Sequence, residues 1–171
     1  IHMIEAMKRA GLAPAEAIMV GMAFGPGQVL GRVGEMVWGS RFPAVTTGRV
    51  AMAALPLAML FLVSGSMNFP LALLFSAVCG MSNGMVTIAR GTVSLALFGR
   101  ERYGAVIGDL AIASLGARAC GPVALAWGLE RAGLQGSAAI GLGFALAAVG
   151  AMEIVAIIDR RHRQEKSTQP A

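Results

Sequence analysis

Charged residues are scarce in this sequence. Asp, Glu, Lys and Arg make up only 13% of its 171 residues, and the mean hydropathy is +0.69. A soluble domain carries about 25% charged residues. A chain with so few charges cannot cover itself with a polar surface, so we expect its solvent to be the hydrocarbon of a lipid bilayer.

Residues that carry catalysis or bind metals are also few. The two histidines, His2 and His162, lie at opposite ends of the chain, without Ser, Cys or acidic residues at the spacing of a catalytic triad or a metal site. No phosphate-binding loop or dinucleotide fingerprint is present. We therefore expect no enzyme, metal, cofactor or nucleic-acid partner. Cys79 and Cys120 lie in apolar runs, and we expect both to be small buried hydrophobes.

Five long apolar stretches fill most of the chain. A helix needs about 20 apolar residues to cross a bilayer, and these stretches lack the alternation of membrane strands. We therefore predict an all-α membrane protein: a helical bundle over 1–166, a helix stub at 1–9 and a disordered tail at 167–171. Because the sequence begins Ile-His-Met, we expect residue 1 to be internal to a longer protein. The five predicted spans are 13–38, 45–67, 69–98, 103–129 and 136–158.

Basic residues are unevenly distributed between the alternate connections. Eight lie in one set and three in the other, and cytoplasmic loops carry the excess of Lys and Arg. This bias predicts a cytoplasmic C-terminus. The first set is Arg41, Arg49, Arg100, Arg102, Arg160, Arg161, Arg163 and Lys166; the second is Lys8, Arg9 and Arg131.

A polar stripe follows one face of the span 69–98, because its members recur every three or four residues. Asn83 lies near mid-span, where it cannot reach an interface. It either faces a solute pathway or bonds a neighbouring helix that glycines allow to come close. Arg90 is expected at the cytoplasmic edge or paired with Asp109 or Glu35. The stripe consists of Ser76, Gly80, Asn83, Thr87, Arg90 and Ser94.

The span 13–38 carries Gln28, Arg32 and Glu35 on one face. We favour an ion pair between Arg32 and Glu35 at the cytoplasmic end over a pathway role for these two, because both lie close to the loop. For Gln28 both interpretations stay open. Glycines four residues apart predict close helix packing at Gly21/Gly25 and Gly27/Gly31.

The span 103–129 places Arg118 near the middle of the bilayer, where a charge is costly. We favour a cavity-facing cation over a buried ion pair with an acid from elsewhere. Asp109 is nine residues away on the opposite face, so the two are not partners. Asp109 and Glu153 are expected to be structural, with proton coupling as the alternative.

The segment GRVGEMVWGSRF at 31–42 resembles the signature between helices 8 and 9 of the major facilitator superfamily (MFS), with Gly31, Glu35 and Arg41 at the matching positions. Met36 stands where an arginine is usual. GMSNGMVTIARGT, followed by FGRERYGAVIG, is similar to helices 10 and 11 of bacterial members. The chain as a whole resembles the C-terminal half of such a transporter, from the end of helix 7 through helix 12.

This resemblance implies a secondary transporter, a permease or efflux protein of the bacterial inner membrane. It would move a small solute, in some cases with protons, by alternating access, and its partner would be the missing helices 1–6 and most of helix 7. The alternative is a truncated membrane protein without transport activity. The resemblance implies pathway residues at Gln28, Asn83, Thr87, Arg90 and Arg118, a gate at Gly31, Arg32, Glu35 and Arg41, and proton coupling at Asp109 or Glu153.

Overall fold

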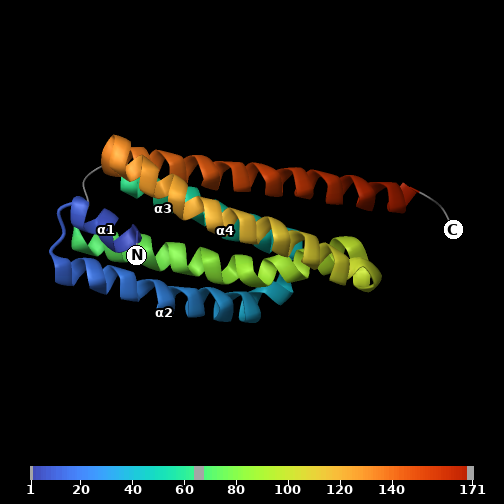
Figure 1. The fold of residues 1–171 in the computed structure, drawn as a ribbon. Helices are drawn as coiled ribbons and strands as arrows, with labels where there is room; N and C mark the ends of the chain where they lie inside the picture. The colour runs from blue at the N-terminus through green and yellow to red at the C-terminus, as the bar shows by residue number, and fades with distance from the viewer. Residues whose placement is uncertain (1, 64–67, 169–171) are drawn as a thin grey trace.

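The computed structural model describes residues 2–63 and 68–168, and every element in this part of the chain is a helix (Figure 1). The predicted all-α class is therefore confirmed. The predicted stub and first two spans match helices to within one residue, except that residues 1 and 64–67 lie outside the described residues. The elements are α1 (His2–Arg9), α2 (Pro14–Trp38), the short 3₁₀ helix η1 (Gly39–Arg41), α3 (Ala44–Val63) and α4 (Phe69–Thr168).

α4 is not one straight rod. Its backbone leaves the helical region at Gly99 (φ 69°) and Gly133 (φ 65°), in the left-handed region that glycine adopts without a Cβ clash. The chain doubles back at both points, which gives three antiparallel segments at 69–98, 100–132 and 134–168 (Figure 1). These glycines lie in two of the loops that the sequence predicted. The helix continues to Thr168, so it overlaps the start of the tail predicted at 167–171, and residues 169–171 lie outside the described residues.

Polar side chains fix where two of these helices begin. Oε2 of Glu16 accepts a hydrogen bond from the backbone N–H of Ala13 (2.9 Å), and Oδ1 of Asn68 accepts one from Leu71 (3.0 Å). These carboxylate and amide oxygens satisfy donors that a helix start leaves without a backbone partner. The first turns of α2 and α4 are thereby anchored at the same end of the bundle (Figure 1).

α2 and α3 each pack against α4 rather than against each other. The contact between α2 and the first segment of α4 is close because glycines line both sides. A Cβ atom at Gly27 would lie 2.6 Å from the carbonyl oxygen of Ala77, and Cβ atoms at Gly31, Gly80 and Gly84 would collide with facing backbone carbonyls. The close packing predicted at Gly27/Gly31 is confirmed. A Cβ at Gly25 would meet nothing within 4 Å.

Large apolar side chains cover much of the outer surface. Met36 is 73% exposed and Ile112 is 72% exposed, and similar residues continue along α2, α3 and α4. Within residues 2–63 and 68–168, two stretches are long and apolar enough to cross a membrane: Phe69–Gly133, which contains the reversal at Gly99, and Gln135–Arg161. Ala44–Leu60 is apolar but shorter. By length and composition, the helices therefore support two candidate spanning stretches and not the count of five.

Candidate functional site

A cavity of about 310 Å³ lies among the helices. Its wall is almost entirely apolar, and its polar side chains are Asn83, from the first segment of α4, and Ser137, from the third. An apolar hollow with a few polar groups is the usual form of a small-molecule site. Other wall residues come from α1 (Met7), α2 (Phe24), α3 (Met59) and the second segment of α4 (Leu129).

Three members of the predicted polar stripe are exposed, and they follow one another along the helix from the cavity wall. Asn83 is at the cavity wall, and Thr87 and Arg90 follow at one-turn intervals. The Thr87 hydroxyl donates to the backbone carbonyl of Asn83 (2.8 Å). This hydrogen bond does not involve the side-chain amide of Asn83. A guanidinium nitrogen of Arg90 lies 3.5 Å from Oγ of Ser114, in the second segment. The result is a polar strip at the junction of two segments of α4.

The other stripe members are buried, so the stripe does not face a single environment. Ser76 is fully buried and donates to the carbonyl oxygen of Val20 in α2 (2.6 Å). Gly80 is covered by the backbone of α2, and Ser94 is 4% exposed. The exposed stripe members are therefore Asn83, Thr87 and Arg90, the three residues of this span that were predicted to line a pathway.

The predicted pairing of Arg32 with Glu35 is wrong. Arg32 is exposed, whereas Glu35 is only 7% exposed, and its Oε2 has no hydrogen-bond partner in the described part of the chain. The helix turns the two side chains toward different surroundings. Arg41 is exposed in η1, and the structure does not bring it to Glu35 as a partner. Gly31 lies in the close contact with Met81.

The remaining candidate pathway residues are not gathered at the cavity. Gln28 is half-buried, and its backbone faces Gly80 and Gly84. Arg118 is exposed on the second segment and does not line the cavity. Among the described side chains Arg118 forms no ion pair, and Asp109, also exposed, does not pair with it or with Arg90.

Glu153 is paired. Its Oε1 lies 2.6 Å from Nε of Arg49 in α3, so it forms the kind of structural contact that we favoured.

The expectation for the cysteines holds for one of the two. Cys79 is buried at the cavity wall, whereas Cys120 is exposed, which corrects the prediction that both are buried. The second segment has no cover on that face, and a helix pattern alone does not reveal this.

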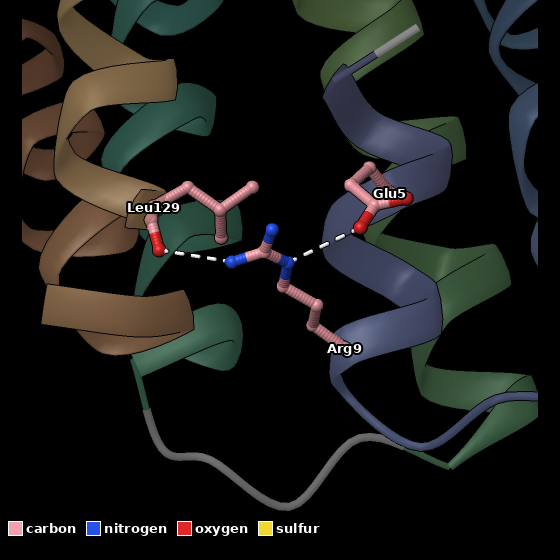
Figure 2. A network of polar contacts seen from close by, with 3 residues as sticks. All are labelled: Glu5, Arg9 and Leu129. Atoms are coloured by element: carbon pink, nitrogen blue, oxygen red, sulfur yellow. Dashed lines mark hydrogen bonds and ion pairs between the residues drawn. The ribbon is translucent and has the colours of Figure 1, made fainter. Parts of the chain in front are cut away.

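Contacts made by Ser82 and by Arg9 were missed from the sequence. Ser82 is fully buried and donates to the carbonyl oxygen of Ala51 in α3 (2.6 Å), and its signal was a hydroxyl beside small residues. Arg9 reaches from α1 to the carbonyl oxygen of Leu129 (3.1 Å) and also pairs with Glu5 (3.2 Å) (Figure 2). This guanidinium bonds a carbonyl near the end of the second segment, where helices favour positive charge.

The comparisons with known proteins identify no relative: no family model, no curated protein and no solved structure matches the chain. The resemblance of residues 31–42 to the MFS signature therefore stays a prediction. No group of three or more His, Cys, Asp or Glu that could hold a metal lies within residues 2–63 and 68–168.

Proposed function

We propose that this chain is the membrane-embedded C-terminal half of an MFS-type secondary transporter, which moves a small solute by alternating access. In this proposal the five helices 13–38, 45–67, 69–98, 103–129 and 136–158 cross the bilayer, and the C-terminus is cytoplasmic, as the excess of basic residues in one set of loops indicates. The membrane is the inner membrane of a bacterium. The function belongs to the whole transporter, with this chain supplying one side of the pathway.

The observation that carries the proposal is the exposed polar strip on an otherwise apolar helix. Asn83, Thr87 and Arg90 are exposed, whereas apolar residues such as Leu74 and Leu95 cover other surface of the same segment. An amide and a guanidinium are expensive in hydrocarbon, so in a membrane this strip must face water or another protein segment. A solute pathway shared with a second half-bundle satisfies that requirement.

The roles that we propose for Asn83, Arg90 and Arg118 follow from their depth in the membrane and from their charge. Asn83, at the wall of the cavity, offers both a donor and an acceptor to a polar solute. Arg90 lies two turns farther toward the proposed cytoplasmic end, held by Ser114. Arg118, exposed near the middle of its segment, supplies a positive charge for an anionic solute or for a carboxylate of the other half.

The test is transport by the complete parent protein in cells or proteoliposomes. Arg118→Ala and Asn83→Ala should each abolish or greatly reduce transport, while membrane insertion and expression stay at the parental level. Glu101→Gln, an exposed acid in the predicted loop, is the matched control and should transport normally. Normal transport by both pathway variants would refute the proposal.

The upstream reading frame separates this proposal from a truncated, non-transporting membrane protein. An open frame that encodes six or more further spans supports the transporter. A stop codon, or translation that starts near Met3, favours the truncated protein.

A further inference from the structure

A second cavity, of about 360 Å³, lies where α2, η1 and α3 meet the first segment of α4. It shares no residue with the cavity that contains Asn83. Its wall is apolar except for Glu35, Thr46 and Thr47. Leu30 and Val50, which line it, are 60% and 59% exposed, so the cavity opens on the outer surface of the bundle.

Glu35 is the unusual member of this wall. The residue is 7% exposed, and its Oε2 has no hydrogen-bond partner within residues 2–63 and 68–168. Burying a carboxylate without a partner is costly, and a bound cation removes that cost. The nearest basic residue along the helix, Arg32, is exposed and is not bonded to Glu35. The carboxylate therefore lacks a counter-charge from the part of the chain that the structure describes.

The residues that line the cavity around Glu35 indicate which kind of cation it can bind. A hard metal ion requires about six oxygen ligands, and this wall offers one carboxylate and two threonine hydroxyls. An organic ammonium ion needs fewer oxygens and gains from aromatic faces, and Trp38 and Phe42 line the cavity. Met81 and Met85 add flexible, polarisable side chains that adapt to varied apolar shapes.

We propose that this cavity binds a small amphiphilic amine, with its ammonium group on the Glu35 carboxylate and its apolar body against Trp38, Phe42 and the methionines. The volume suits a small molecule and not a two-chain lipid. The site is peripheral to the polar strip at Asn83, so it goes beyond the proposed transport function. Its test uses binding alone and does not depend on transport.

The experiment uses the 171-residue chain in micelles of an uncharged detergent. Trp38 serves as the reporter in a Trp127→Phe background, because the chain has only two tryptophans. The probes are 4-phenylbutylamine, which is protonated at neutral pH, and 4-phenylbutan-1-ol, its neutral counterpart of similar shape. We expect saturable change in Trp38 fluorescence, with the amine binding at least tenfold more tightly than the alcohol.

Glu35→Gln should remove the preference for the amine, whereas Glu101→Gln, which changes an exposed acid outside the cavity, should keep it. Gly34→Leu is the second variant. A Cβ at Gly34 meets nothing within 4 Å, so the larger side chain fills the cavity while Glu35 stays in place, and binding of both probes should fall at least tenfold.

Several results would overturn the proposal. No saturable binding of the amine, equal binding of amine and alcohol, or an amine preference that survives in Glu35→Gln would each do so. If Glu35→Gln does not fold, undiminished amine binding by Gly34→Leu decides against the site. Displacement of the amine by phosphatidylethanolamine added to the micelles would assign the cavity to a lipid and equally refute a soluble amine as its ligand.

Discussion

Nε of Arg49, in the second turn of α3, lies 2.6 Å from Oε1 of Glu153 in the third segment of α4. The two residues are 104 positions apart in the sequence, so this ion pair joins two helices that are distant along the chain. Both side chains are partly exposed, at 34% and 43%. Both residues lie within five positions of the proposed cytoplasmic ends of their spans (45–67 and 136–158), so in a membrane we expect water to reach the pair.

A double-mutant cycle should give a small coupling energy for this pair. Partly exposed ion pairs contribute about 0.2–1 kcal/mol, because solvent screens the attraction and ordering the side chains costs entropy. We expect the free energy of unfolding in mixed micelles to show a coupling below about 1 kcal/mol between Arg49→Met and Glu153→Gln. The control cycle, Arg49→Met with Glu101→Gln, should show none. A coupling of several kcal/mol would contradict a solvent-screened pair.

Replacement of Gly31 tests the close contact between α2 and the first segment of α4. Gly31→Ala forces a Cβ against the backbone of Met81, and overpacking of this kind costs roughly 1–3 kcal/mol. Gly25→Ala, in the same helix, meets nothing and should be neutral or stabilising by up to about 1 kcal/mol, because alanine is the better helix former. The measurement is the free energy of unfolding of both variants. Equal effects at the two positions would show that glycine acts here only through helix propensity.

The helices themselves were predictable from the sequence. Apolar runs of span length marked their bodies, and the glycines at 99 and 133, within two residues of an arginine, marked two reversals. These signals are local, because a helix bonds its own backbone and a reversal needs only a few residues with suitable dihedral angles.

The environment of each helix face was not predictable in the same way. Ser76 and Asn83 share a face by helical period, yet Ser76 bonds the backbone of α2 and Asn83 is exposed. Burial depends on which neighbour covers the face at each level, and the period of one helix does not contain that information. The predicted ion pair between Arg32 and Glu35 was wrong for the same reason. Their spacing permits the pair, but the packing of α3 and α4 buries only the acid.

Removal of Arg9 should loosen α1. Its guanidinium bonds both Glu5 in α1 and the carbonyl oxygen of Leu129, so it ties this eight-residue helix to the second segment of α4 (Figure 2). Helices this short are unstable without tertiary contacts. We expect Arg9→Gln to increase hydrogen exchange of the α1 amides by several-fold, while exchange in α3 and α4 is unchanged.

Lys8→Gln is the matched control, because the exposed Lys8 carries the same charge and its side chain makes no hydrogen bond or ion pair within the described chain. Its exchange pattern should equal that of the unmodified protein. Equal protection of α1 in both variants would show that the burial of Met7, which is 0% exposed, is sufficient to hold the helix.

Cysteine labelling can determine whether the polar strip meets water or lipid. The background is the complete parent protein in native membranes, with Cys79 and Cys120 replaced by alanine. Thr87→Cys should react with a charged, membrane-impermeant thiosulfonate at least tenfold faster than Phe144→Cys, because a thiol must ionise in water to react quickly. Phe144 is 59% exposed in the third segment of α4, whose predicted span 136–158 carries only Glu153 as a charged residue, so it reports on a lipid-facing surface.

Added substrate should slow the reaction of the cysteine at position 87 and leave that of the cysteine at position 144 unaffected. If both cysteines are equally inert, the strip faces lipid or a tightly packed protein segment, and the proposed pathway along Asn83, Thr87 and Arg90 is wrong.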